Sequence, residues 1–144
     1  LDRIRGYTQA IQDYGIEMDD ELIKEGYFSY SEAYQCAREL MKKSGKLTAV
    51  FCANDIMAAA FMHVAMENGF GIPKDFSVIG FDDIKNSDLY IKGMPMLTTI
   101  RQPRYEMAAY AVKALISQIH GDEPLDNKVF NTELIIREST ALKQ

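Results

Sequence analysis

The sequence has 144 residues, of which 47% are hydrophobic and 26% charged, and a formal net charge of −5 at pH 7. This length and composition are typical of one globular unit and exclude a multi-domain, disordered or collagen-like protein. No apolar run approaches the roughly 20 residues needed to cross a bilayer, which excludes a membrane span. Acidic and basic residues are interleaved and form no basic stripe, so this chain alone is not expected to bind DNA.

The first predicted element is an amphipathic helix over residues 2–14, which ends at Gly15. The helical pattern begins at once, without the cationic start and apolar core of a signal peptide. We therefore expect the chain to be part of a longer protein. Cys36 and Cys52 have neither disulfide nor metal-ligand spacing and are predicted to be buried free thiols of a cytoplasmic protein.

Three elements are predicted before the middle of the chain. Residues 22–28 are β-compatible and predict a short strand. The S-x-x-E sequence from Ser29 to Glu32 is typical of a capping box and predicts a second helix that stops before Gly45. The apolar run at 48–53 predicts a strand that is buried on both faces of a parallel sheet.

The rest of the chain continues the alternation. We expect a helix that begins at an Asn54 cap and extends to about residue 68, strands at 76–81 and 97–101, a helix over 103–120 and a final strand at 129–136. This order predicts an α/β fold, a doubly wound and mostly parallel sheet with right-handed crossovers. A strand should precede the first helix of such a fold. The chain has none there, which again indicates part of a longer protein.

Residues with polar or aromatic side chains follow the predicted strands. They are Phe28, Asn54, Asp82 and Gln102. Because open α/β sheets bind ligands beyond the carboxyl ends of their strands, these side chains are expected to converge. Carboxylates and amides bind vicinal hydroxyl groups, and an aromatic ring covers the apolar face of a sugar. The set therefore predicts a site for a polyol.

Each of these residues also has a structural interpretation. Asn54 can serve only as a helix cap, which contributes about 1 kcal/mol. Asp82 can cap the turn that follows its strand, and Phe28 can belong to the core. The shared location of the four residues is what favours a binding site.

Enzymatic chemistry is not predicted. The chain has no G-x-x-x-x-G-K-[ST] loop and no G-x-S-x-G motif. His63 and His120 lack partners at metal-ligand spacing, so neither a metal nor another cofactor is expected. The Asp82-Asp83 pair is compatible with a phospho-receiver, but the lysine that such a site needs after a later strand is missing.

Four ordered motifs resemble one family. They are CANDIMAAA (52–60), IPKDFSVIGFDD (72–83), LTTIRQPRYEMA (97–108) and TELIIREST (132–140). They resemble the effector-binding domain of LacI/GalR transcriptional regulators, the lactose- and galactose-repressor family. The resemblance implies a fold like that of periplasmic sugar-binding proteins, with two subdomains around a ligand cleft, and a homodimer that binds DNA through an N-terminal helix-turn-helix outside this chain.

The resemblance also implies a division of the chain. Residues 1–101 match mostly the C-terminal subdomain, residues 102–124 the crossover helix of the N-terminal subdomain, and residues 125–144 the return to the C-terminal subdomain.

The resemblance further implies roles for individual residues. Its effector-binding positions match Arg3, Phe28, Asn54, Asp82 and Gln102. Tyr90 and Ile91 match a region of the dimer interface, although either can equally be a loop anchor. Ala60 and Ala108 stand where the family often has glycine, and Arg104 stands at a variable position near the cleft.

The function expected from this resemblance is a sensor. A sugar or related small metabolite controls operator binding, and no bond is made or broken. Two alternatives remain: an extracytoplasmic sugar-binding protein of related fold, and a regulator that responds to a protein co-regulator.

Overall fold

The computed structural model describes residues 2–85, 90–123 and 125–142. Its helices and strands are α1 (Asp2–Asp13), α2 (Tyr30–Met41), β1 (Ala49–Phe51), α3 (Asp55–Glu67), β2 (Ser77–Phe81), β3 (Thr98–Arg101), α4 (Arg104–His120) and β4 (Glu133–Ile135). The sheet has the order β1-β2-β3-β4, with β1, β2 and β3 parallel and β4 antiparallel to β3. The predicted α/β fold with a mostly parallel sheet is confirmed.

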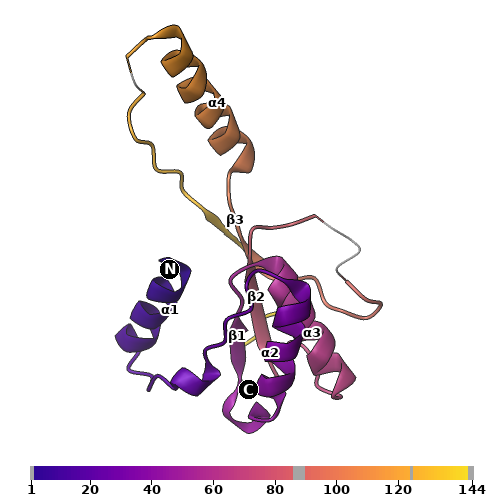
Figure 1. The fold of residues 1–144 in the computed structure, drawn as a ribbon. Coiled ribbons are helices and arrows are strands. Elements are labelled where there is room, and N and C mark those ends of the chain that lie inside the picture. The colour runs from indigo at the N-terminus through magenta and orange to yellow at the C-terminus, as the bar shows by residue number, and fades with distance from the viewer. Residues whose placement is uncertain (1, 86–89, 124, 143–144) are drawn as a thin grey trace.

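Helices cover both faces of the sheet (Figure 1). α2 and α3 pack against each other on one face, where Val78 of β2 is fully buried in their core. On the other face Phe51 of β1 stacks on Tyr7 of α1, with 6.4 Å between the ring centroids. Because successive side chains of a strand point to opposite faces, Val50 and Phe51 contact different helices.

The core is centred on α3. Ala58, Ala59 and Ala60 are fully buried in succession, so this helix is apolar around its circumference rather than amphipathic. Phe76 closes the core and contacts Phe61 edge to face, with 5.8 Å between the ring centroids. The small side chains of the alanine run allow close packing of α3 on the sheet.

Gly80 marks the tightest contact of α3 with the sheet. A Cβ at this position would lie 2.8 Å from Cδ2 of Leu97 and still closer to the carboxylate of Asp55. We expect Gly80→Ala to lower the free energy of unfolding by roughly 1–3 kcal/mol, the usual cost of overpacking, as measured by urea denaturation. Gly6→Ala is the control, because a Cβ at this position of α1 meets nothing within 4 Å. Equal midpoints for Gly80→Ala and the unchanged protein would contradict this packing.

Two predictions about the first third of the chain are wrong. Residues 22–28 form no strand. A 3-10 turn over Asp20–Leu22, in which the side chain of Asp19 accepts a hydrogen bond from the Glu21 amide, takes the first of them. The backbone then turns at Tyr27 and Phe28, whose φ angles of 48° and 55° are incompatible with a strand. Ser29 begins α2 without capping it through its side chain, and its hydroxyl pairs with that of Ser31 at 2.9 Å.

Three further expectations need correction. The strand expected at 48–53 is shorter and half-buried, because β1 lies at an edge of the sheet. The final strand covers only Glu133–Ile135 of the expected 129–136. Cys52 is buried as predicted, whereas Cys36 on α2 is only half-buried.

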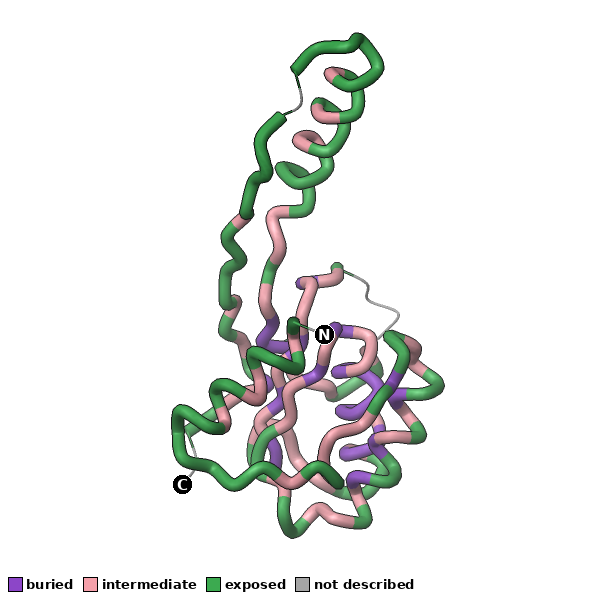
Figure 2. The backbone as a smooth tube through the Cα atoms, turned by 60° about the vertical axis from the view of Figure 1, so that its left-hand side comes forward, coloured by how far each residue is buried: buried purple, intermediate pink, exposed green. Residues whose placement is uncertain are grey.

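α4 projects away from the rest of the molecule, connected by two segments that run side by side (Figures 1 and 2). None of its described residues is buried, although Val112, Leu115 and Ile119 are apolar. The helix begins after Pro103 and ends at Gly121, whose φ is 77°, as the sequence predicts. Within the described part of the chain, no helix combines the length and apolar character that a bilayer span requires.

Candidate ligand-binding site

Arg3 is the centre of the candidate site. Its guanidinium carbon lies 4.0 Å from the ring centroid of Phe81 and 5.7 Å from that of Phe28. Its nitrogens donate to the Ala53 carbonyl and, at 3.2 Å, to Oδ1 of Asp82. One side chain of α1 thus contacts the ends of β1 and β2 and the turn before α2.

Asp82 and Gln102 meet beside Arg3. Asp82 directly follows β2, Gln102 directly follows β3, and the Gln102 Nε2 donates to Oδ1 of Asp82 at 2.5 Å. Arg3 and Gln102 both donate to Oδ1 of Asp82. The other carboxylate oxygen, Oδ2, receives no hydrogen bond from the described residues and can accept one from a ligand. The expected convergence of strand-end residues therefore occurs for Asp82 and Gln102, with Arg3 added from the helix.

Asn54 has the structural role that the sequence allowed. Its Oδ1 accepts a hydrogen bond of 2.8 Å from the Met57 amide, so it caps α3. Asn54 is buried and adjoins Ala53, whose carbonyl accepts from Arg3. Among the described residues, no hydrogen bond joins its side chain directly to Arg3, Asp82 or Gln102. A ligand role for Asn54 stays a prediction and would use its amide nitrogen.

Phe28 is exposed rather than part of the core. It retains 60% of its accessible surface, and its ring faces the Arg3 guanidinium. Tyr27 beside it is also exposed. An exposed ring that already contacts a site residue favours a stacking surface over a core position.

Backbone strain coincides with the site. The non-glycine residues with positive φ, among those described, form two adjacent pairs: Tyr27 with Phe28, and Asp82 with Asp83 at 106° and 50°. Such conformations persist where surrounding contacts fix them, and they cluster at functional sites.

Phe81 is a site residue that the strand pattern missed. The run at 76–81 suggests a strand buried throughout, yet Val78 and Gly80 are buried whereas Phe81 is half-buried below Arg3. The two-residue alternation within the strand was the available signal, because it places Phe81 on the face opposite Val78.

The predicted dimer residues differ in burial. Tyr90 is partly buried and packs against the core, which agrees with a loop anchor, whereas Ile91 is 40% exposed. A role of either residue in a dimer stays a prediction.

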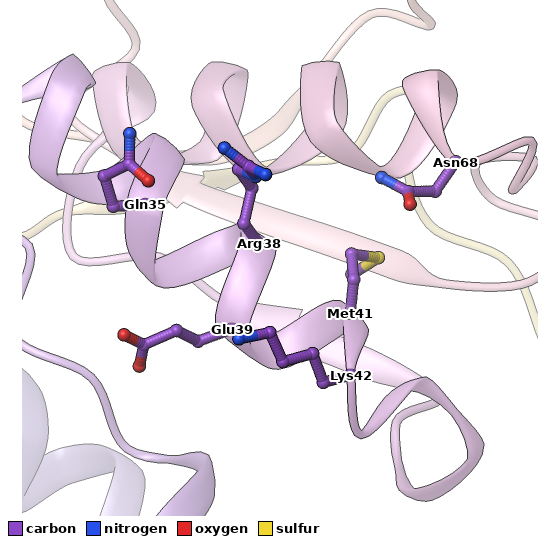
Figure 3. A pocket seen from close by; sticks show the side chains of 6 residues that line it. All are labelled: Gln35, Arg38, Glu39, Met41, Lys42 and Asn68. Carbon is purple, nitrogen blue, oxygen red and sulfur yellow. The ribbon is translucent and has the colours of Figure 1, made fainter.

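A separate surface groove lies between the C-terminal parts of α2 and α3 (Figure 3). Its lining residues are Gln35, Arg38, Glu39, Met41, Lys42 and Asn68. None of them belongs to the Arg3 site, and Met41 is partly buried against the core. The groove therefore does not extend the candidate site.

The fold and the site agree with one class of protein. The family model described as a periplasmic binding protein-like domain matches residues 1–140. The chain therefore belongs to the family of periplasmic binding protein-like domains.

The relatives narrow this class. The chain is 37% identical over 137 residues to the HTH-type transcriptional regulator MalR of Clostridium butyricum, a match that covers 95% of this chain and 40% of the relative. Together with similar solved structures of LacI family regulators, this match confirms the resemblance to the effector-binding domain of LacI/GalR regulators. The chain thus spans about 40% of the length of the curated relatives it matches.

Two solved structures are similar over nearly the whole chain. A complex of the transcriptional regulator CelR with cellobiose has a TM-score of 0.85 and 32% identity, covering 95% of this chain and 41% of that one. A LacI family regulator from Enterococcus faecium with bound ribose has a TM-score of 0.84 and 35% identity, covering 98% of this chain and 52% of that one.

Proposed function

We propose that this chain is the ligand-sensing part of a LacI-type transcriptional regulator and binds a sugar or related small metabolite. The observation that carries the proposal is the convergence of Arg3, Asp82 and Gln102 beside the rings of Phe28 and Phe81. The free carboxylate oxygen and the amide groups bind hydroxyls, and an exposed ring covers the apolar face of a sugar. The sugar complexes of the two similar structures support this ligand class.

The proposed protein is longer than this chain and has two subdomains. Residues 1–101 and 125–144 lie mostly in the C-terminal subdomain, and residues 102–124 reach into the other one. The exposed apolar side chains of α4, such as Val112 and Ile119, support this division because they need a cover. We place the dimer interface near Tyr90 and Ile91, and DNA binding outside this chain.

The proposed mechanism is a shift between two subdomain arrangements. A sugar that contacts both subdomains favours one arrangement, which changes the spacing of the two DNA-binding heads in the dimer. The protein acts in the cytoplasm, where its operator is, and catalyses no reaction. The relatives named as transcriptional regulators favour this function over an extracytoplasmic binding protein.

Thermal unfolding of the complete gene product tests the proposal. The probes are neutral sugars including ribose and cellobiose, nucleosides and amino acids. A ligand at a hundredfold excess over its Kd stabilises by about 2.7 kcal/mol, which corresponds to a rise in Tm of roughly 5–10 °C. We expect at least one sugar to produce this rise in the complete gene product. The 144-residue chain alone contains one wall of the cleft, so its Tm should rise less with the same sugar.

The other outcomes separate the alternatives. No rise with any probe, together with stabilisation by a co-purifying protein, would overturn the sugar sensor in favour of a protein co-regulator. A complete gene product that consists of these 144 residues alone would overturn the two-subdomain proposal.

A further inference from the structure

Asp83, beside the candidate site, is surrounded by arginines. Its side chain is only 5% exposed and accepts hydrogen bonds from Nε of Arg101, at 2.7 Å, and from the Arg137 guanidinium. Arg104 donates to its backbone carbonyl at 3.1 Å. Burial acts to raise the pKa of Asp83, but the bonds from Arg137 and Arg101 outweigh it and lower the pKa, so the carboxylate is charged at neutral pH.

Two of the three arginines lie where the chain leaves the sheet for α4, and the third lies beyond β4, the strand to which the chain returns. Arg101 ends β3 and Arg104 begins α4. Arg137 lies two residues beyond β4, after the chain has returned from α4 and rejoined the sheet, and it also donates to the Leu97 carbonyl at 2.7 Å. One buried carboxylate thus joins the point where the chain leaves for α4 to the residues that follow the returning strand.

The backbone of Asp83 is fixed as well. Its φ of 50° lies in the left-handed region, and its amide donates to the Thr99 hydroxyl of β3 at 3.4 Å. Asp82, the preceding residue, carries the candidate ligand-binding carboxylate at a φ of 106°. A rotation of this turn therefore moves Asp82 and this anchor together.

We propose that Asp83 is a positioning residue that fixes the direction in which α4 leaves the sheet and links it to the conformation of the Asp82 turn. If the proposed function holds, this link carries a ligand-dependent change at Asp82 and Gln102 to α4. Two packed segments that share one buried ion-pair cluster move as a unit, which is the kind of element that a ligand can bias.

A distance measurement between two spin labels tests the proposal without a sugar. The labels are attached to Lys113→Cys on α4 and Arg38→Cys on α2, both exposed positions, in a chain carrying Cys36→Ser. The buried Cys52 remains. We expect one narrow distance distribution in this background. Asp83→Asn should widen it at least roughly twofold, because the neutral amide no longer holds both guanidinium groups.

The matched control is Glu133→Gln. Glu133 is a second carboxylate near Arg101, at 3.5 Å, but it is 68% exposed, and among the described residues its side chain has no hydrogen bond or ion pair with the Asp82 turn. We expect this variant to keep the narrow distribution. If Asp83→Asn does not fold, Arg101→Gln replaces it, because Arg101 is 44% exposed and its loss leaves no buried charge without its Arg137 partner.

A residue that only stabilised the fold would lower Tm and leave the distribution of folded molecules unchanged. Unchanged widths in Asp83→Asn, or in Arg101→Gln where it replaces that variant, therefore overturn the proposal. Because no sugar is added, that result leaves the sugar-binding proposal standing. If sugars fail to bind, the label distances, which are measured without sugar, still test the role of Asp83.

Discussion

Replacing Asp82 by alanine should weaken sugar binding roughly 10- to 100-fold, because hydrogen bonds to a charged group contribute about 1.5–3 kcal/mol. The substitution removes the carboxylate oxygen that is free for a ligand and the acceptor shared by Arg3 and Gln102. Titration calorimetry on the complete gene product, with the sugar that raises its Tm, measures the effect.

The matched control is Asp122→Ala, which removes an exposed carboxylate just after α4. It changes the net charge equally and should leave the Kd unchanged. A Kd for Asp82→Ala within error of the unchanged protein would place the sugar elsewhere. Tm of each variant without sugar shows whether a loss of affinity reflects unfolding.

Strand ends are the part of the site that could be predicted from the sequence. Buried strands of a parallel sheet have recognisable apolar runs, and the residue after each run lies at a shared edge. Asp82 and Gln102 follow their strands directly and their side chains meet at 2.5 Å. Local sequence suffices here because the geometry of the sheet itself brings the two positions together.

Phe28 lies beside Arg3, as the predicted convergence requires, but the strand from which its position was predicted is absent. The ring reaches Arg3 because Tyr27 and Phe28 adopt positive φ angles. Aromatic residues rarely adopt this conformation by their own preference. Tertiary contacts impose it, so local propensity could not reveal it.

The arginine cluster at Asp83 could not be predicted from the sequence. Arg137 lies 54 positions from Asp83 along the chain and reaches it because β4 returns antiparallel to β3. The alternation of helices and strands predicts a mostly parallel sheet but not the direction of its last strand. Contacts that depend on that direction need the structure.

Asp55 is expected to give the largest loss of stability on replacement by alanine. It is 1% exposed, and it accepts hydrogen bonds from the Thr99 hydroxyl at 2.5 Å and from the Ile84 amide at 2.7 Å. Asp55→Ala leaves both donors unpaired, at a cost of about 1–3 kcal/mol each, partly offset by removal of a buried acid. We expect the free energy of unfolding to fall by roughly 2–4 kcal/mol in urea denaturation.

Asp55→Asn is the matched variant. An asparagine can accept from the Ile84 amide through its oxygen and donate to the Thr99 hydroxyl, which can serve as acceptor. It should therefore retain most of the stability that alanine loses. Equal losses for both substitutions would show that the two hydrogen bonds do not account for the role of Asp55.

The unchanged protein and Asp55→Asn should differ in how their free energy of unfolding depends on pH, and the sign of that difference can be predicted. Burial, only partly opposed by the bonds from Thr99 and Ile84, raises the pKa of Asp55 above its ordinary value of 3.8. The folded state therefore holds this proton more tightly than the unfolded chain. Its contribution to stability is complete below the ordinary pKa and is lost as pH rises through the raised pKa.

Asp83 acts in the opposite direction, because its pKa is lowered and its contribution is lost on acidification. Subtracting the unfolding free energies of the unchanged protein from those of Asp55→Asn removes most of the Asp83 contribution, since both proteins contain it. What remains is the repulsion between Asp83 and Asp55, which also raises the pKa of Asp55. We expect this difference to increase from acid to neutral pH, as urea denaturation across that range can measure. A difference that is flat or decreases would mean that Asp55 titrates in the folded state as it does in the unfolded chain.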